Sequence, residues 1–534
     1  MLSASAMSSA LLRAPRLFAL AAACSAIVAC SSADPAATPG PGQTDPPAPT
    51  PACVEGQTRC EGDLVSTCAV GPGGEPAFSP AVACAGDAVC KGAACVEPTA
   101  GQRAQAAELL EVVGYLQGNT AWHGPLDWAR IRDDGKRRIF RGDGGELDYF
   151  TALFHAFIAV PQGHQGLYAG RACGKLVPMP GFAQRGACGR PHPRGVIVTQ
   201  VAAGNALGLA KGDLIVGLGA ARGDAVLAEL SQRPSCATSR PGASFTAFTT
   251  ATTFSDLVRP GEKLEVESPD GAVRAVTVPD GALSGDLQKA LFCQDPFGRD
   301  TRKPVESELR PDGVGVIRLP GFTDPEQPFP TSGNPADIDA YQAKFEDKIQ
   351  AAFDAVKTAR AIVWDVRGNG GGLTRVGLDI ASGFPGAQAG DISYCQARIP
   401  ESDPPAFDTF KYATYALAPG GRFAYAGKVA VLIDGLDYSA ADYFPLAVKT
   451  KTSAILVGAP TAGGFGATSA TRDFKGPPSF SVSVDLNRCS AAADDTPLEG
   501  RGVTPHVAAE YDPKDVAAGR DSILERAVRE LDAR

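Results

Sequence analysis

The segment AIVWDVRGNGGG, residues 361–372, constrains the fold of this chain more than any other part of it. Val363 and Trp364 favour a buried strand, whereas the three glycines at 370–372 favour a turn with exposed backbone. Glycines directly after a hydrophobic strand let successive N–H groups point to one spot and bind an anion there. A phosphate loop would add a lysine and a hydroxyl, and no GxxxxGKS or GxxxxGKT pattern follows. The segment therefore predicts an oxyanion site or a purely structural turn.

A second segment, KVAVLIDGLDYSAADYFPLAV at 428–448, predicts a buried strand, a turn and a helix that begins near Ser439. A serine at this junction lies beside the free N–H groups of a helix N-terminus, which favour developing negative charge. The alternative is an ordinary N-cap serine. Ser439 is thus a candidate nucleophile.

Four motifs follow one another along the chain: DVRGNGGG (365–372), SAAD (439–442), TAGG (461–464) and EGRGVTPH (499–506). They resemble, in the same order, the DxRxNxGG, SAxE, TxG and EGxGVxPD motifs of the serine peptidases that include the tail-specific (C-terminal processing) proteases and the tricorn core. The resemblance implies a multidomain α/β fold with a ClpP/crotonase-like peptidase core. It also implies a hydrolase that needs no cofactor and no metal.

The resemblance leaves the identity of the general base to be decided. The tail-specific branch uses a serine–lysine dyad, but the position of that lysine is Gly464 here, and the nearby lysines 449, 451 and 475 are out of register. The tricorn-like branch takes a histidine from well before the glycine turn and a carboxylate from after the nucleophile. His164 and Glu499 stand at those places, so we expect a histidine base.

The expected chemistry is acyl transfer. Ser439 attacks a carbonyl carbon, His164 takes its proton and returns it to the leaving amine, and Glu499 orients the imidazole. The N–H of Ala440 and one from Gly370 or Gly371 would bind the oxyanion.

The tricorn pattern has a serine directly before the histidine, where this chain has Gly163. A relay from His164 to Glu499 would then use Gln162, Gln165 or a water. The alternative for His164 is a loop histidine with a structural hydrogen bond. The other four histidines are weaker candidates: His155 should be packed on a helix, His192 should lie in a loop, and His506 replaces the aspartate of the closing VxPD motif. His123 is a weaker candidate as well.

Residues 173–280 resemble a PDZ domain with an insertion from Ala221 to about Thr253. Their strands alternate apolar residues, and KGDLIVGLG resembles the turn and strand typical of that family. PDZ domains add an extended peptide, often a C-terminus, to a sheet edge. Protein or peptide substrates are therefore the expected partners.

The N-terminal region predicts export. Residues 1–29 carry Arg13 and Arg16 before an apolar stretch of signal-peptide length, and Cys30 ends a segment that resembles a bacterial lipobox. We expect lipidation of Cys30 and a membrane anchor, on the outer membrane because aspartate does not follow the cysteine; plain secretion is the alternative. Residues 30–52 are proline-rich and predict an extended tether.

Residues 53–96 hold six cysteines and predict a small module with three disulfides, since so short a segment cannot build a large core. Zinc is the alternative, but paired CxxC spacing is missing. Six further cysteines suggest the pairs Cys173–Cys188, Cys236–Cys293 and Cys395–Cys489, although sequence does not establish connectivity.

The remaining segments complete the expected domain order. Residues 101–170 predict a helical segment that delivers His164, and 281–534 predict the peptidase core. The formal charge of −9 argues against nucleic acid as a partner. Two functions from different classes follow: a lipid-anchored serine peptidase of the cell envelope, and a catalytically inactive relative that binds peptides. A hydrolase of another acyl substrate is a third.

Overall fold

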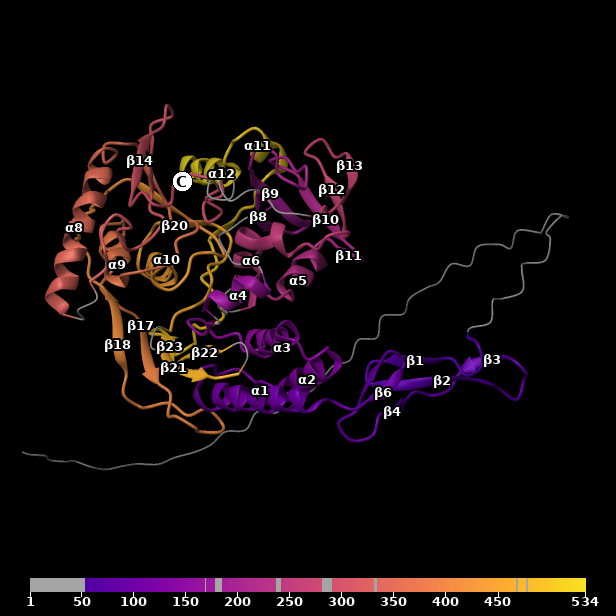
Figure 1. Ribbon diagram of the computed structural model, residues 1–534. Helices are drawn as coiled ribbons and strands as arrows, with labels where there is room; N and C mark the ends of the chain where they lie inside the picture. The colour runs from indigo at the N-terminus through magenta and orange to yellow at the C-terminus, as the bar shows by residue number, and fades with distance from the viewer. Residues whose placement is uncertain are drawn as a thin grey trace, which may run out of the picture.

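The computed structural model describes residues 53–168, 170–177, 185–236, 242–280, 291–330, 334–466, 469–476 and 479–534. The predicted signal peptide, Cys30 and the proline-rich tether lie outside the described residues. The described chain folds into a mixed α/β body from which the cysteine-rich module projects (Figure 1). In the described part of the chain, no helix has both the length and the apolarity needed to cross a bilayer.

A six-stranded sheet forms the centre of the C-terminal domain, in the order β14-β15-β16-β19-β20-β24. Its strands are β14 (Glu306–Leu309), β15 (Val314–Arg318), β16 (Ala361–Asp365), β19 (Lys428–Ile433), β20 (Ile455–Gly458) and β24 (Val507–Ala508). All neighbours pair in parallel except β14, which runs antiparallel to β15. The carboxyl ends of β16 and β19 therefore meet at one edge of the sheet, which is where loops carry function in parallel sheets.

Helices cover both faces of this sheet because successive strand residues point to opposite sides. On one face, Ile362 and Trp364 pack under α8 (Pro335–Asp354), α9 (Thr374–Ser382) and α10 (Ala440–Lys451). On the other face, Val363 packs with α12 (Ser522–Ala533), which follows the short α11 (Pro513–Ala517). The helix predicted to begin near Ser439 is α10.

The helical segment predicted before the core consists of α1 (Ala100–Asn119), α2 (Trp128–Arg141) and α3 (Glu146–Ile158). These helices share a hydrophobic cluster with a three-stranded sheet of β7 (Gly166–Tyr168), β22 (Phe480–Asp485) and β21 (Ser469–Phe474). Because β7 pairs with β22, the loop between α3 and β7 is fixed against the C-terminal half of the chain. That loop contains His164.

A further small sheet consists of β18 (Tyr412–Leu417), β17 (Gly390–Ala397) and β23 (Asn487–Ala491). The disulfide Cys395–Cys489 joins β17 to β23, as predicted.

The region predicted to be PDZ-like, residues 173–280, is called the second domain. It contains a sheet in the order β13-β12-β10-β9-β8, with β11 paired to β10. Its strands are β8 (Ala187–His192), β9 (Gly195–Val201), β10 (Leu214–Leu218), β11 (Ala221–Arg222), β12 (Lys263–Glu267) and β13 (Val273–Thr277). The helices of this region are α4 (Gly170–Leu176), α5 (Ala225–Ser231) and α6 (Gly242–Leu257). Most of the predicted insertion forms α5 and α6, and α6 packs on β8.

Two of the predicted disulfides are wrong. The structure pairs Cys173 with Cys236 and Cys188 with Cys293, instead of pairing neighbours in the sequence. The reason is topological: β8 carries Cys188 to the edge of its sheet, and the chain returns there only after β13, with Cys293. Spacing along the chain cannot reveal such a return.

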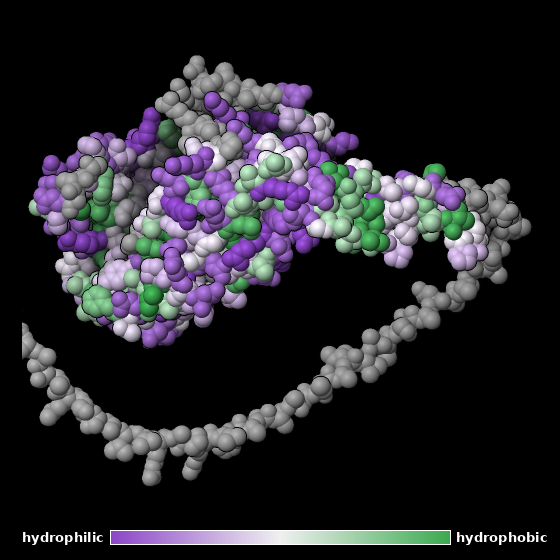
Figure 2. Space-filling model, turned by 60° about the horizontal axis from the view of Figure 1, so that its bottom comes forward, coloured by the Kyte–Doolittle hydropathy of each residue, from purple (hydrophilic) through white to green (hydrophobic). Residues whose placement is uncertain are grey.

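The cysteine-rich module consists of β1 (Thr58–Glu61), β2 (Leu64–Val70), β3 (Pro76–Phe78), β4 (Val82–Ala83), β5 (Val89–Lys91) and β6 (Ala94–Val96). Its disulfides are Cys53–Cys68, Cys60–Cys90 and Cys84–Cys95, so the three-disulfide prediction is confirmed and no cysteine there is left to bind zinc. Ion pairs from Arg137 and Arg141 to Asp63 tie the module to α2. Figure 2 shows hydrophobic side chains along the module, where Val54 and Val82 are exposed.

Candidate active site

Ser439 links β19 to α10 in a strained backbone conformation, with φ 63° and ψ −120°. Only five non-glycine residues of the described chain have positive φ: Ala93, His164, Glu401, Ser439 and Asp495. Two of the five are the predicted nucleophile and the predicted base. Strain of this kind persists only where surrounding structure enforces it, and it is concentrated at functional sites. The strained turn also leaves Ser439 at the N-terminus of α10, where the helix dipole favours negative charge.

The glycine turn after β16 is fixed to the turn before Ser439 by hydrogen bonds. Two buried carboxylates of the second turn accept backbone N–H groups of the first: Asp434 from Gly368 at 3.1 Å, and Asp437 from Asn369 at 3.2 Å. The Tyr438 N–H donates in return to the Asn369 carbonyl at 3.0 Å. Burial raises the pKa of Asp437 well above its ordinary value. The nucleophile and the glycine turn are therefore one rigid unit.

Gly371 must be glycine, because its φ is 99° and a β-carbon there would lie 2.7 Å from Ser439 Cβ. Its N–H donates to Asn369 Oδ1 at 2.8 Å. That bond occupies the donor, so the prediction that Gly371 binds the oxyanion is corrected by the geometry. Gly370 is exposed, with open space around its Cα. Gly370 and Ala440, which starts α10, stay the candidate oxyanion donors.

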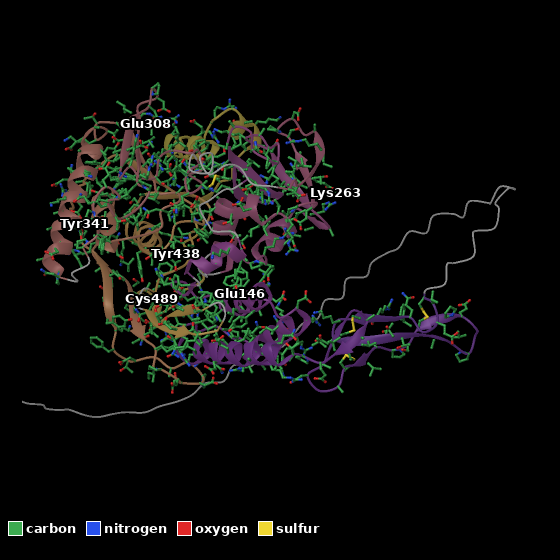
Figure 3. The ribbon with its side chains drawn as sticks, in the orientation of Figure 1. Glu146, Lys263, Glu308, Tyr341, Tyr438 and Cys489 are labelled. Carbon is green, nitrogen blue, oxygen red and sulfur yellow. A yellow bond between two sulfur atoms is a disulfide. The ribbon has the colours of Figure 1, made fainter. Side chains whose placement is uncertain are left out.

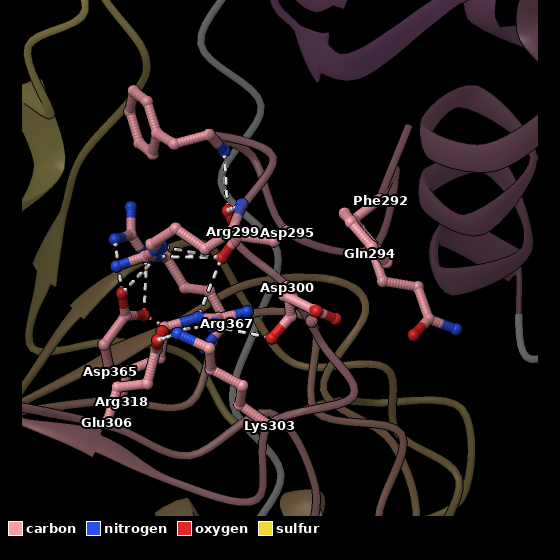
Figure 4. Close-up of polar contacts among 12 residues, drawn as sticks. Phe292, Gln294, Asp295, Arg299, Asp300, Lys303, Glu306, Arg318, Asp365 and Arg367 are labelled. Atoms are coloured by element: carbon pink, nitrogen blue, oxygen red, sulfur yellow. Dashed lines mark hydrogen bonds and ion pairs between the residues drawn. The ribbon is translucent and has the colours of Figure 1, made fainter. Parts of the chain in front are cut away.

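Ion pairs under the glycine turn account for the aspartate and arginine of the first motif (Figure 4). Arg367, fully buried, contacts Asp365 at 2.8 Å and Asp521 at 2.5 Å. Arg299 contacts Asp365 at 2.8 Å and also Asp295. Burial alone would raise the pKa of Asp365, but the two arginines lower it well below its ordinary value. Asp365 and Arg367 thus hold the glycine turn in place.

The segment before β14 also contacts the glycine turn. A β-carbon at Gly368, whose φ is 80°, would collide with the carbonyl oxygen of Gln294. Arg190 of β8 donates to the carbonyl oxygens of Cys293 at 2.8 Å and Gln294 at 2.7 Å. This segment is therefore held between the sheet of the second domain and the glycine turn.

Asp442, the last residue of the SAAD motif, connects Ser439 to the TAGG turn. Its buried carboxylate accepts the Ser439 N–H at 3.1 Å, the Thr461 hydroxyl at 2.5 Å, and the N–H groups of Gly463 and Gly464 at 2.7 and 2.9 Å. Burial raises the pKa of Asp442 to about 6, against these hydrogen bonds, which lower it. Asp442 thus fixes the backbone of Ser439 to the TAGG turn.

Glu499 is fully buried and accepts three backbone N–H groups. Oε1 accepts from Gly163 at 2.6 Å, and Oε2 accepts from Phe465 at 2.8 Å and Gly466 at 3.1 Å. Burial raises the pKa of Glu499 to about 7, against the hydrogen bonds from Gly466, Gly163 and Phe465. Glu499 thus holds the residue before His164 by its backbone N–H. The relay from Glu499 to the His164 ring stays a prediction.

The glycine at 163 is explained by this contact. A β-carbon there would lie 2.6 Å from Glu499 Oε1 and 2.9 Å from Gly464 Cα. The serine of the tricorn pattern would therefore not fit. The two glutamines offered for the relay also support the loop: Gln162 donates to Asp485 at 3.2 Å, and Gln165 to the Val160 carbonyl at 2.6 Å.

His164 lies against Tyr438, the residue directly before the nucleophile. The two rings are stacked, with centroids 4.5 Å apart and planes at 30°. The backbone N–H of His164 donates a hydrogen bond to the Tyr438 hydroxyl. Tyr438 lies near the centre of the molecule, between the core sheet and the helices α1–α3 (Figure 3). The sequence motifs did not single out Tyr438; its position next to Ser439 was the available signal.

The other histidines have contacts of their own. The His123 ring lies against Trp122 in a tilted arrangement, His192 accepts the backbone N–H of Arg194, and His506 accepts the backbone N–H of Leu456. Burial lowers the pKa of His155 to about 4. Within the described residues, no group of three histidine, cysteine or acidic side chains is arranged to hold a metal ion.

A cavity of about 240 Å³ lies beside the turn that precedes Ser439. Its walls are mainly apolar and come from both domains, including Ala247 of α6 and Leu436, Ala459 and Ala462 of the core. The backbone N–H of Ala462 donates to the carbonyl of Asp437 at 2.8 Å. Asp437 is two positions before Ser439 in the sequence, so this wall of the cavity contacts the turn that carries the serine.

Comparison with known proteins gives a family match to part of the chain. Residues 313–509 match the model of peptidase family S41. No curated protein sequence matches the chain.

Two solved structures share the fold. One is mature CPAF complexed with lactacystin, with 14% sequence identity, a TM-score of 0.54, and coverage of 81% of this chain and 98% of that chain. The other is mature CPAF, with 15% identity, a TM-score of 0.53, and coverage of 81% and 97% respectively.

Proposed function

We propose that this chain, which carries a domain of peptidase family S41, is an active serine peptidase with His164 as its general base. The observation that carries the proposal is the strained Ser439 at the N-terminus of α10, next to the residue on which His164 stacks. A serine kept at positive φ by buried hydrogen bonds costs stability, and such a cost is expected where the hydroxyl has a function. The same sharp strand-to-helix turn exposes nucleophilic serines in unrelated hydrolases.

In the proposed mechanism, Ser439 Oγ attacks the carbonyl carbon of a peptide bond while His164 accepts the hydroxyl proton. The N–H groups of Ala440 and Gly370 stabilise the tetrahedral oxyanion. Collapse of this intermediate breaks the C–N bond, and His164 returns the proton to the leaving amine. Water then attacks the acyl-enzyme by the same route and frees Ser439. Glu499 acts on this cycle by holding the backbone of Gly163, which fixes His164.

We propose that the substrates are peptides or proteins, and that the second domain helps to bind them. Its antiparallel sheet with the edge strands β8 and β13, flanked by α5 and α6, supports the PDZ-like interpretation, in which an edge takes up a peptide C-terminus. The cavity between α6 and the core is the candidate site for an apolar substrate side chain, because its walls adjoin the Ser439 turn.

We further propose that the protein acts in the bacterial cell envelope, anchored by a lipid on Cys30, with secretion as the alternative. Six disulfides support an oxidising compartment. The module that projects from the body would then serve as a spacer next to the anchor.

The test is active-site labelling of residues 53–534 with a fluorophosphonate, comparing wild type with Ser439→Ala and His164→Ala. We expect labelling of wild type, none of Ser439→Ala, and a loss of at least about a hundredfold in His164→Ala. Folded wild type that is not labelled would support the inactive, peptide-binding relative. Labelling that survives His164→Ala would exclude His164 as the base. A labelled enzyme that cleaves esters but no peptide would indicate a different acyl substrate.

A further inference from the structure

Tyr438 lies against His164, Gly163 and Gly464. Its hydroxyl accepts the His164 N–H, and its ring stacks on the imidazole. A β-carbon at Gly163 would lie 3.2 Å from the hydroxyl oxygen, and one at Gly464 would overlap ring atom Cε2. One aromatic side chain thus bounds the backbone before the base, the base itself and the TAGG turn.

We propose that Tyr438 is the positioning residue for the base: its ring and hydroxyl hold the His164 imidazole in the orientation that receives the Ser439 proton. This inference rests on the proposed function. His164 has φ 52°, a conformation that a histidine keeps only when neighbours enforce it. Glu499 fixes the residue before it, and Tyr438 is the neighbour that contacts both its backbone N–H and its ring.

The covalent link to the nucleophile makes this arrangement effective. Tyr438 and Ser439 are consecutive, and the Tyr438 N–H is fixed to the Asn369 carbonyl of the glycine turn. Any shift of the nucleophile turn therefore moves the platform under His164 in the same direction.

The ring also determines which side chains the TAGG turn can carry. The space next to Gly464 is filled by Tyr438, because Cε2, Cδ2 and Cζ all lie within 2.9 Å of the point that a β-carbon would occupy. No side chain fits at 464 while the ring is there, so the lysine of the tail-specific pattern is excluded sterically. Tyr438 and Gly464 are expected to behave as a coupled pair.

The first experiment separates positioning from a general structural effect. Fluorophosphonate labelling rates are measured for Tyr438→Phe, in wild type and in His164→Ala. Loss of the hydroxyl should slow labelling roughly three- to tenfold in wild type and leave the residual rate of His164→Ala unchanged, because the effect passes through His164. Equal slowing in both backgrounds would overturn the positioning role.

Chemical rescue gives a second readout that a purely structural residue would not change. Added imidazole should restore labelling of His164→Ala, since the Tyr438 ring still offers a stacking surface, and should not restore His164→Ala/Tyr438→Ala. Equal rescue of both variants would overturn the proposal. Wild type that is not labelled at all would overturn the peptidase proposal and the positioning role together.

The steric pair is tested without activity. Gly464→Ala should lower the unfolding temperature by several degrees in wild type and cause no further loss in Tyr438→Ala. Gly114→Ala is the matched control, because a β-carbon there meets open space, and it should leave the unfolding temperature unchanged or higher. The same loss for Gly464→Ala in both backgrounds would show that the ring does not limit position 464.

Discussion

Replacing Glu499 with glutamine should change how stability depends on pH. Burial raises the pKa of Glu499 from 4.5 to about 7 in the folded protein. Between these two values the native carboxyl keeps its proton while the unfolded one has lost it. Stability therefore falls as the pH rises through this window, and it levels off above about pH 7, where both states are ionised. Glutamine cannot ionise, so this contribution disappears in Glu499→Gln.

The size of the effect follows from the shift. A difference of about 2.5 pKa units at about 1.4 kcal/mol each gives about 3.5 kcal/mol. For a domain of some 200 residues this corresponds to roughly 7–14 °C in unfolding temperature. The unfolding temperature of wild type should exceed that of Glu499→Gln most at about pH 4.5 and least above about pH 7. Part of the difference should persist above about pH 7. The reason is that both oxygens of the Glu499 carboxylate accept backbone N–H groups, whereas the glutamine amide has one oxygen and can accept from only one side.

The measurement is thermal unfolding of wild type, Glu499→Gln and the control Glu308→Gln from about pH 4.5 to about pH 8. Glu308 is exposed and lies far from Tyr438 in Figure 3, so its substitution removes a carboxyl without disturbing the site. The difference between wild type and Glu499→Gln should shrink as pH rises, and the difference from Glu308→Gln should not. A Glu499 difference that stays constant or grows with pH would refute the reasoning.

Three further predictions concern the nucleophile, the domain junction and the cavity. Ser439→Gly should be more stable than Ser439→Ala by about 1–3 kcal/mol, since glycine relieves the positive φ; equal unfolding temperatures would argue against strain. Replacing Cys188 and Cys293 by serine should cost about 4–5 kcal/mol by loop entropy and slow labelling, because the disulfide spans 105 residues; unchanged unfolding would contradict this. Ala459→Trp should reduce cleavage of peptides with large apolar side chains roughly tenfold or more without slowing fluorophosphonate labelling, unlike the control Ala426→Trp; full cleavage would exclude the cavity as a substrate site.

The core of the fold could be predicted because its signals are local. The apolar runs at 361–365 and 428–433 are strands β16 and β19, and the helix expected near Ser439 begins at Ala440. Hydrophobic runs and helix-start signals depend on neighbours in sequence, so they survive without knowledge of the tertiary structure.

The parts that sequence did not reveal depend on contacts between distant segments. Tyr438 contacts His164 because β7 pairs with β22 and carries His164 to it. The Cys188–Cys293 pairing likewise requires the return of the chain after β13. The motif residue Gly371 was assigned as an oxyanion donor, but its N–H is taken by a side chain two residues away, a choice between equivalent donors that only geometry decides.

The segment at Cys293 and Gln294, which is held between the sheet of the second domain and the glycine turn, limits how small a working enzyme can be. The family match begins at residue 313, yet the glycine turn rests on Gln294, its ion pairs need Arg299 and Asp521, and the proposed base is residue 164. A fragment cut at the match boundaries would lose supports on both sides of the turn. We expect such a fragment to be inert even if it folds, so the smallest catalytic unit is nearly the whole body of the protein.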